Sequence, residues 1–232
     1  MEAARNRLMA SLSRHIREPR VMDAMANVPR ELFVGEQVRE RAYDDVALSI
    51  GDGQSISQPF MVAVMTQALE LTGTERVLEV GTGSGYQAAV LAQLCDRVVT
   101  VERIPALANV ARARLKKLGC ENVEVHLAWP EDPLGCAALA PYEAVVVTAA
   151  APHVPQVLLA QVRTGGRIVI PVGDRDEQQL LQVSVTLDGD TTSRRLTRCR
   201  FVPLIGPDAW PAAVPSEPAA REPYDGSDGH SE

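Results

Sequence analysis

Apolar residues follow helical spacing over most of the N-terminal part of the chain. Leu8, Leu12 and Ile16 recur on one side of a predicted helix. Gly51-Asp52-Gly53 interrupts a later apolar segment and predicts a turn between two short strand-like arms. We expect a helical stretch over residues 4–27 and a mixed loop with one helical turn over residues 30–43. A turn with short arms is expected over residues 46–56 and a second helix over residues 61–71.

The pattern changes near residue 75, where short apolar runs begin to alternate with helical segments. This alternation favours a mostly parallel sheet with helices on both faces. Stricter alternation of polar and apolar residues near the end predicts antiparallel strands at the edge of the sheet. The expected strands cover residues 76–80, 97–102, 123–126, 144–148, 167–172, 179–187 and 195–202. The expected helices cover residues 86–94, 105–118 and 157–162, and a turn is expected over 164–166.

Length and composition indicate one main domain with an added lobe. The chain has 232 residues, and 46% of them are hydrophobic, which is enough for a real core. After Pro207 the sequence is rich in Pro, Ala, Ser, Asp and Glu, a composition typical of disorder. We therefore expect a small helical lobe over residues 1–58, a core over 59–206 and a disordered tail over 207–232.

Charge and cysteine usage argue against several classes of protein. The formal net charge of −7 repels phosphate backbones, so we expect no nucleic-acid partner. The sequence contains neither 18 consecutive apolar residues nor a signal-peptide run, so we expect no membrane span and place the chain in the cytoplasm as a monomer. The four cysteines are scattered without paired spacing, so we expect neither a metal site nor a disulfide framework.

A glycine-rich loop follows the first strand of the alternating region. It reads Glu79-Val80-Gly81-Thr82-Gly83-Ser84-Gly85 and precedes a predicted helix, which is a nucleotide-binding arrangement. The dinucleotide fingerprint requires a glycine at position 86, where Tyr86 stands instead. Glu79 leads into the loop and suits a cationic ligand, such as the sulfonium of S-adenosylmethionine (AdoMet), better than a pyrophosphate.

Glu102 ends the next predicted strand, where a carboxylate can accept hydrogen bonds from both ribose hydroxyls of a ligand. A ribose-binding acid fits NAD as well as AdoMet. Combined with the glycine loop, it predicts an α/β protein of the class I AdoMet-dependent methyltransferase type, with a Rossmann-like doubly wound sheet. An NAD-dependent oxidoreductase is disfavoured by Tyr86 and by the lack of a catalytic Tyr/Lys or His/Asp arrangement.

Further segments between about residues 5 and 206 resemble one family, the protein-L-isoaspartate (D-aspartate) O-methyltransferases. Its most specific mark is Ser55-Ile56-Ser57-Gln58-Pro59, placed ahead of the core. The resemblance implies a carboxyl O-methyltransferase that uses AdoMet to methylate L-isoaspartyl and D-aspartyl residues in damaged proteins or peptides, which starts repair through a succinimide. The resembling segments are Val28-Pro29-Arg30-Glu31-Leu32-Phe33-Val34 with Ala42-Tyr43, Gly51-Asp52-Gly53-Gln54 with the stretch above, Val147-Thr148-Ala149-Ala150-Ala151-Pro152 and Arg200-Phe201-Val202-Pro203-Leu204.

The resemblance also implies roles for individual residues. Ser57 is expected to be the catalytic residue, because it would hydrogen-bond the substrate carboxylate and hold it near the methyl group. A carboxylate is already ionised and nucleophilic at neutral pH, so the reaction needs positioning rather than a strong base. The expected cofactor contacts are Ser55, Ile56, Glu79, Gly81, Thr82, Gly83, Gly85, Glu102 and Arg103. The expected substrate contacts are Ser57, Thr148, Ala149, Ala150, Val202 and Leu204. From spacing alone, Ser57 is also a plausible N-cap for a helix beginning at Pro59.

One segment departs from the family's pattern. After the third strand the family usually has Gly-Asp-Gly, whose acid contacts the adenine end of AdoMet, whereas residues 127–135 read Leu-Ala-Trp-Pro-Glu-Asp-Pro-Leu-Gly. Glu131 and Asp132 are both candidates to replace that acid, and Trp129 either stacks on adenine or packs. Two other interpretations therefore stay open: a diverged relative that methylates a dedicated peptide, and a non-catalytic protein that binds AdoMet or a peptide.

Overall fold

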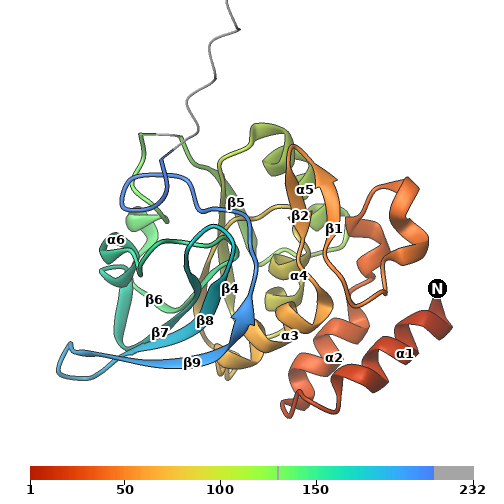
Figure 1. The fold of residues 1–232 in the computed structure, drawn as a ribbon, viewed down its shortest axis with the longest axis horizontal. Helices are drawn as coiled ribbons and strands as arrows, with labels where there is room; N and C mark the ends of the chain where they lie inside the picture. The colour runs from red at the N-terminus through yellow and green to blue at the C-terminus, as the bar shows by residue number, and fades with distance from the viewer. Residues whose placement is uncertain (130, 212–232) are drawn as a thin grey trace, which may run out of the picture.

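The computed structural model describes residues 1–129 and 131–211 of the chain. These residues form a seven-stranded sheet, a separate two-stranded hairpin and several helices (Figure 1). The helices are α1 (Glu2–Leu12), α2 (Pro19–Asn27), η1 (Arg30–Phe33), η2 (Glu36–Arg41), α3 (Pro59–Ala68), α4 (Tyr86–Ala92), α5 (Pro105–Lys117), η3 (Ala137–Leu139) and α6 (Gln156–Leu159). The strands are β1 (Leu48–Gly51), β2 (Gln54–Ile56), β3 (Arg76–Val80), β4 (Arg97–Glu102), β5 (Val123–Leu127), β6 (Tyr142–Val147), β7 (Val162–Gly173), β8 (Gln178–Val185) and β9 (Thr191–Cys199).

The helical stretch predicted over residues 4–27 is two helices, α1 and α2. Pro19 occupies the first turn of α2, where its missing N–H removes no helical hydrogen bond. Glu18 caps the same helix, because its side chain accepts the Arg20 N–H at 3.2 Å. The following loop contains two short 3-10 helices, η1 and η2, where the sequence pattern predicts one helical turn.

The main sheet has the strand order β5-β4-β3-β6-β7-β8-β9. The strands from β5 to β7 are parallel, and β8 and β9 are antiparallel additions, as the sequence pattern predicts. The chain leaves β3 toward β4 on one side and later returns to β6 on the other. Such a switch point opens a crevice at the carboxyl ends of the strands, which is where open α/β sheets bind their ligands.

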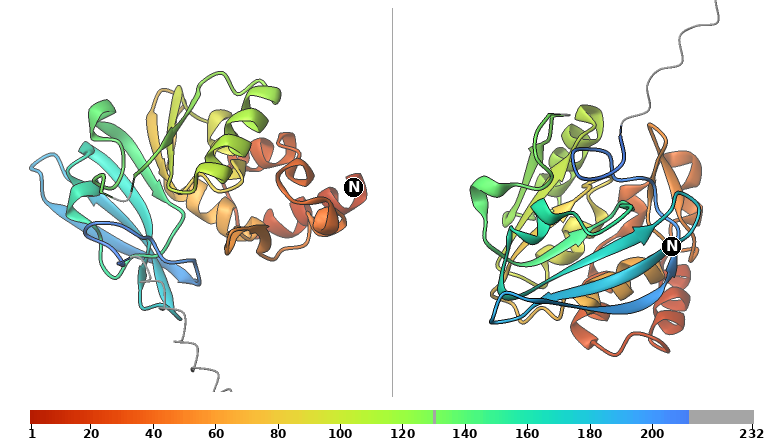
Figure 2. Two further views of the ribbon diagram at one scale, coloured as in Figure 1. Left: turned by 90° about the horizontal axis from the view of Figure 1, so that it is seen from above. Right: turned by 60° about the vertical axis from the view of Figure 1, so that its left-hand side comes forward.

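Both faces of the sheet are buried, because consecutive residues of a strand point to opposite sides. Val77 and Leu78 of β3 are both fully buried, yet they belong to two different apolar clusters. The first cluster includes residues of α1, α2, α3 and α4, and these helices lie together beside the sheet in the left view of Figure 2. The second cluster includes Leu134 and Leu158 on the other face, where coverage comes from loops and the short α6.

Three elements near the end of the sheet differ from their predicted bounds. The strand predicted over residues 195–202 is β9, which covers Thr191–Cys199. The helix predicted over residues 157–162 is the shorter α6, and β7 begins at Val162, earlier than residue 167. The turn predicted over 164–166 is an irregularity inside β7, where Gly165 has a φ of +77° and the pairing with β6 shifts register. Glycine tolerates that backbone conformation, so the strand continues through the stretch that the sequence pattern predicts as a turn.

The chain after β9 returns to the carboxyl ends of the strands. The Trp210 N–H donates to the Leu204 carbonyl at 3.0 Å, and the Gly206 N–H donates to the Trp210 carbonyl at 3.0 Å. Residues 207–211 of the predicted tail are therefore described, and residues 212–232 lie outside the described residues. Within the described ranges, every helix is too short or too polar to cross a lipid bilayer.

Candidate active site

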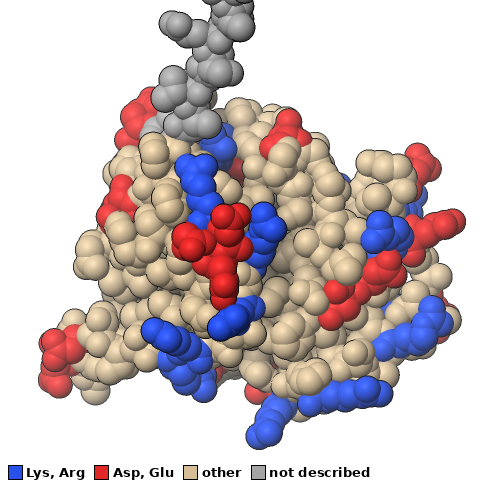
Figure 3. All heavy atoms as spheres, in the orientation of Figure 1, with Lys and Arg blue, Asp and Glu red and all other residues tan. Residues whose placement is uncertain are grey.

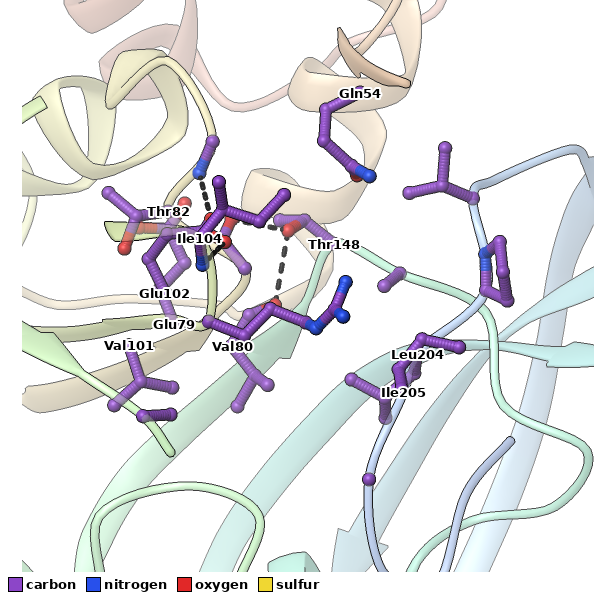
Figure 4. Close-up of a pocket in the computed structure, with 18 of the residues that line it drawn as sticks. Gln54, Glu79, Val80, Thr82, Val101, Glu102, Ile104, Thr148, Leu204 and Ile205 are labelled. Atoms are coloured by element: carbon purple, nitrogen blue, oxygen red, sulfur yellow. Dashed lines mark hydrogen bonds between the residues drawn. The ribbon is translucent and has the colours of Figure 1, made fainter. Parts of the chain in front are cut away.

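A cavity of about 670 Å³ opens at the carboxyl ends of β3, β4, β5 and β6. Figure 4 shows Glu79, Thr82 and Glu102 on one side of it and Leu204 and Ile205 on the opposite side. The β1–β2 hairpin of the N-terminal lobe closes a third side. The cavity therefore brings together residues from the glycine loop, the N-terminal lobe and the segment after β9, as the resemblance implies. The predicted site residues that line it are Ser55, Ile56, Ser57, Glu79, Gly81, Thr82, Gly83, Glu102, Arg103, Thr148, Ala149, Val202 and Leu204.

The glycine loop between β3 and α4 is fixed by backbone contacts. The N–H groups of Gly81 and Thr82 both donate to the Val101 carbonyl of β4, at 2.9 and 3.2 Å. Gly81 has a φ of +102°, and a Cβ there would lie 2.4 Å from the Thr148 hydroxyl oxygen. A side chain at this position would thus collide with β6, so glycine is required for the close approach of the two strand ends.

Gly85 is predicted to contact the cofactor but is not among the residues that line the cavity. It has a φ of +87° and is the N-cap residue of α4, and a Cβ there would lie 3.3 Å from the Ala111 Cβ of α5. Its place in the fold is therefore the tight contact between α4 and α5. Ala150 is also absent from the cavity wall, and its backbone N–H and carbonyl are paired with Val202 and Leu204.

Glu102 at the end of β4 holds the glycine loop in place. One carboxylate oxygen accepts the Gly83 N–H at 2.8 Å, and the other accepts the Ile104 N–H at 2.9 Å. Each carboxylate oxygen has more than one lone pair, so the group can still accept hydrogen bonds from a ligand. The carboxylate is thus oriented toward the cavity with capacity for the two hydroxyls of a ribose.

Glu79 on β3 is fully buried and also lines the cavity. The Thr100 hydroxyl donates to one carboxylate oxygen at 2.5 Å, and the other oxygen, Oε1, has no partner among the described residues. Burial raises the pKa of Glu79 to about 8, the hydrogen bond from Thr100 opposes the rise, and the nearby charge of Glu102 adds to it. A buried acid with an unpartnered oxygen is a site that a cationic or hydrogen-bond-donating ligand would stabilise.

Ser57 follows the β1–β2 hairpin and is held by Arg30. The Arg30 guanidinium is fully buried, and it donates to the Ser57 carbonyl at 2.7 Å and to the Ala42 carbonyl at 2.8 Å. Its Cζ lies 4.8 Å from the ring centroid of Tyr86, the first residue of α4. One buried cation therefore connects the Ser57 segment, the N-terminal lobe and the helix that follows the glycine loop.

The alternative role of Ser57 as a helix cap is wrong. The N-cap of α3 is Gln58, which makes no side-chain cap hydrogen bond, and Asp45 Oδ1 accepts the Phe60 N–H at 2.8 Å. Asp45 thus satisfies the start of the helix from a distant loop. The Ser57 hydroxyl makes no hydrogen bond to another residue in the described ranges, so it is available to a ligand in the cavity.

The wall opposite the glycine loop is made by paired backbone. The Ala150 N–H donates to the Val202 carbonyl at 2.8 Å, and the Leu204 N–H donates to the Ala150 carbonyl at 2.7 Å. The Thr148 hydroxyl donates to the Gly81 carbonyl at 2.6 Å, so it is occupied by the loop (Figure 4). Neither the Val202 N–H nor the Pro203 carbonyl makes a backbone hydrogen bond among the described residues, so both are available to pair with a peptide.

The segment that departs from the family's pattern follows β5 and contributes residues to the cavity wall. Trp129 is 58% exposed and lines the cavity, so it is not a core residue. Asp132 also lines the cavity, and one of its carboxylate oxygens accepts the Trp129 N–H at 2.9 Å. Glu131 is exposed and does not line it. Of the two acids that the sequence offers here, the geometry thus favours Asp132.

Several cavity residues are not predicted from the sequence. Gln54 belongs to a segment that carries the resemblance, and its place beside Ser55 could have suggested a role. Ile104 and Ile205 are apolar residues in loops, and Arg175 lies between β7 and β8; nothing in the pattern distinguishes them. They reach the cavity only because strands distant in sequence are neighbours in the sheet.

The residues present fit AdoMet. The unpartnered oxygen of Glu79 suits its positive charge, the two oxygens of Glu102 suit its ribose, and the glycine loop leaves room for close approach. Trp129 offers an aromatic face at the edge of the same cavity.

Comparison with known proteins agrees with this geometry. The model of the family described as protein-L-isoaspartate(D-aspartate) O-methyltransferase matches residues 3–209. The curated protein-L-isoaspartate O-methyltransferase 1 of Rhodopseudomonas palustris (strain HaA2) is 49% identical over 229 residues, covering 95% of this chain and 90% of that protein. The protein-L-isoaspartate O-methyltransferase of Geobacter metallireducens is 47% identical over 211 residues, covering 90% and 97%.

Solved structures show the same fold. A protein-L-isoaspartate O-methyltransferase matches with a TM-score of 0.78 at 26% identity, covering 88% of this chain and 67% of its own. A Plasmodium falciparum structure described under the same activity, in complex with S-adenosyl-L-homocysteine, matches with a TM-score of 0.71 at 23% identity, covering 84% and 95%. These matches confirm the predicted sheet, its antiparallel end and the helical N-terminal lobe.

The buried position of Arg30 generates a prediction about stability. Arg30→Met should lower the free energy of unfolding by about 1–3 kcal/mol, because buried carbonyl oxygens lose their donor. Arg30→Lys should recover only part of the loss, since one ammonium cannot reproduce the planar guanidinium fork. Urea unfolding measures both. Arg39→Met, at an exposed arginine of η2, is the matched control and should change the value by no more than about 0.5 kcal/mol; equal losses at the two positions would contradict the assigned contacts.

Proposed function

The chain belongs to the protein-L-isoaspartate(D-aspartate) O-methyltransferase family, and on that premise we propose how its cavity carries out the reaction. The enzyme transfers a methyl group from AdoMet to the free carboxylate of an L-isoaspartyl residue in a protein or peptide, and D-aspartyl residues are substrates of the same class. The observation that carries the proposal is the convergence of Ser57, Glu79 and Glu102 on one cavity at the strand switch point.

The cofactor, when bound, supplies a methyl group attached to a positively charged sulfur. A carboxylate oxygen bonds to the methyl carbon as the carbon–sulfur bond breaks, and the sulfur leaves as a neutral thioether. Glu102 accepts the ribose hydroxyls, and Glu79 faces the positively charged end through its unpartnered oxygen. The backbone of Gly81, Thr82 and Gly83 lines the path between them, with Ser55, Ile56 and Arg103 around it. These residues would hold the cofactor in the same cavity that Ser57 lines, so that proximity would provide most of the rate acceleration.

Ser57 donates a hydrogen bond to the carboxylate that is methylated. A neutral hydroxyl orients the nucleophile without neutralising its charge, whereas an arginine would neutralise it. The peptide on either side of the isoaspartate lies along Thr148, Ala149 and the Val202–Leu204 segment, with the Val202 N–H and the Pro203 carbonyl as backbone partners. The resulting methyl ester is a better electrophile than a carboxylate because it can expel its methoxy group. The neighbouring backbone amide nitrogen attacks the ester carbonyl, methanol leaves, and the succinimide that forms is then opened by water.

We further propose that the enzyme is a cytoplasmic monomer that does not act on nucleic acid. Support comes from the net charge of −7 and from four free cysteines, which suit a reducing compartment. The divisions at residues 58 and 206 are part of the same proposal. Light scattering on the purified protein tests the monomer, since a mass near twice 25.1 kDa would contradict it.

Methyl transfer from labelled AdoMet to a short isoaspartyl peptide tests the function, with the aspartyl twin of that peptide as the control substrate. Label should enter the isoaspartyl peptide selectively. Transfer to neither peptide, with AdoMet binding intact, would favour a relative that methylates a dedicated substrate; transfer to both would remove the repair specificity.

In the same assay, Ser57→Ala should lower kcat/KM by about tenfold to a hundredfold, the equivalent of one hydrogen bond to a charged group of about 1.5–3 kcal/mol. The AdoMet Kd should stay unchanged, because the lost contact is with the peptide. Ser49→Ala, on the same hairpin but outside the cavity, is the matched control and should leave the rate unchanged. An unaffected rate in Ser57→Ala would remove its assigned role.

The raised pKa of Glu79 predicts that AdoMet affinity depends on pH. Below a pKa of about 8 the free protein holds Glu79 protonated, and binding a cation favours the ionised form, so binding releases a proton. Affinity should therefore rise with pH, by at most about tenfold per unit, and level off above the pKa. Calorimetry on wild type and Glu79→Gln across this range is the measurement; the variant corrects for titration of the ligand itself. Parallel pH profiles for the two proteins would show that Glu79 does not face the cation.

We propose that Asp132 takes the place of the family's adenine-contacting acid, with Trp129 against the adenine ring. Asp132→Asn should weaken AdoMet binding by about 1.5–3 kcal/mol, the size of a hydrogen bond to a charged group, while the amide oxygen preserves the contact with the Trp129 N–H. Glu131→Gln is the matched control and should bind AdoMet as the wild type does. If the two variants bind equally well, adenine is held by other residues.

A further inference from the structure

The cavity has opposite charges on its two sides. The acids that line it, Glu79, Glu102 and Asp132, lie on the cofactor side. The basic residues that line it, within the described ranges, are Arg103 and Arg175. Arg103 directly follows Glu102, whereas Arg175 lies in the β7–β8 loop beside the wall that the peptide is proposed to follow. Arg175 is therefore the cation on the substrate side, and no role has been assigned to it above.

The acidic neighbours of Arg175 are each engaged by other groups. Asp174 accepts the backbone N–H groups of Glu177 and Asp176 at 2.7 and 2.8 Å, and these bonds hold the pKa of Asp174 below its ordinary value. Glu177 pairs with Arg198 at 3.3 Å, and Asp176 lies 3.8 Å from Arg200. Figure 3 shows the result as acidic atoms near the middle of this face with basic atoms on both sides.

Arg175 is held by an aromatic ring instead of an acid. Its Cζ lies 5.1 Å from the ring centroid of Trp210. Trp210 is itself anchored to the cavity wall, because its backbone pairs with Leu204 and Gly206 at 3.0 Å each. The guanidinium of Arg175 lies over this ring, and the guanidinium N–H groups have no hydrogen-bond or ion-pair partner among the described residues. A cation fixed at a cavity wall with free donors is suited to binding an anion.

We propose that Arg175, held over Trp210, is a subsite for a negatively charged group of the substrate that flanks the isoaspartyl residue. An acidic side chain or the C-terminal carboxylate of a peptide has the required chemistry, since a carboxylate matches the guanidinium fork. The proposal rests on the function proposed above and adds a charge preference to it. The anion bound by Arg175 is assigned to a group beside the isoaspartyl residue and not to the reacting carboxylate, for two reasons. The reacting carboxylate loses its charge on methylation. It is also assigned to Ser57, on the hairpin side of the cavity.

The test compares isoaspartyl peptides that differ in one flanking residue, Gln, Glu or Lys, placed one or two positions to either side. At the position that faces Arg175, the wild type should show a KM about threefold lower for Glu than for Gln, the size expected of one partly exposed ion pair, and a higher KM for Lys. Arg175→Gln should make the three KM values equal, and Arg175→Glu should favour Lys. The kcat on the Gln peptide should stay within about twofold, and high salt should reduce the preference.

Arg195→Gln is the matched control, since it removes an exposed arginine of β9 that lies outside the cavity and pairs with none of the acids beside Arg175, and it should keep the wild-type preference. Equilibrium binding of the three peptides to protein saturated with S-adenosylhomocysteine is measured in parallel. It reports the charge preference without turnover, so a failure of methyl transfer and a failure of this subsite are distinguishable. A wild type that treats the three peptides alike, or an Arg175→Glu variant that keeps the wild-type order, overturns the proposal.

Discussion

Two buried glutamates at the carboxyl ends of neighbouring strands are costly to ionise unless their oxygens have partners, and the geometry of the cavity follows from how each carboxyl group is satisfied. Glu102 uses both oxygens on backbone N–H groups, one of which belongs to the glycine loop. Glu79 has one oxygen on Thr100, its register partner on β4, and one oxygen without a partner. An acid in this state is costly in the free protein and is stabilised by a cation. The same constraint that orders the loop thus prepares a place for a positively charged cofactor.

A second buried charge ties the N-terminal lobe to this centre. Arg30 is enclosed by the lobe, and its desolvation is offset by two carbonyl oxygens and the face of Tyr86. Because one of those carbonyls belongs to Ser57, the position of the hydroxyl depends on α4 as well as on its own hairpin. Asp45 adds to this by capping α3 directly after the hairpin. The lobe is therefore part of the active site and not only a cover for it.

The sequence predicts the parts of the site that depend on local pattern. The strand that ends in Glu79, the glycine loop and Glu102 are each recognisable from neighbouring residues, and the parallel sheet then brings them together. What the pattern does not predict depends on contacts between distant segments. Ser57 is a residue type that often caps helices and it stands just before α3. Only the fold shows that Asp45 caps α3 instead. Arg175 resembles any charged turn residue until Trp210, far along the chain, is placed beneath it.

The chemistry of the reaction explains why the charges in the cavity are arranged in this way. Methyl transfer removes a positive charge from sulfur and a negative charge from the carboxylate, so any contact that stabilises either charge is weaker in the transition state than in the bound reactants. A strong ion pair on the reacting carboxylate would therefore slow the reaction, whereas a neutral hydroxyl, the role proposed for Ser57, would orient it at little cost. An arginine can contribute to binding only where the charge it holds persists, which is on a group beside the reacting one. In the proposed site Glu79 faces a positive charge that the reaction removes from sulfur, so the same contact would favour binding of the cofactor and exchange of the product.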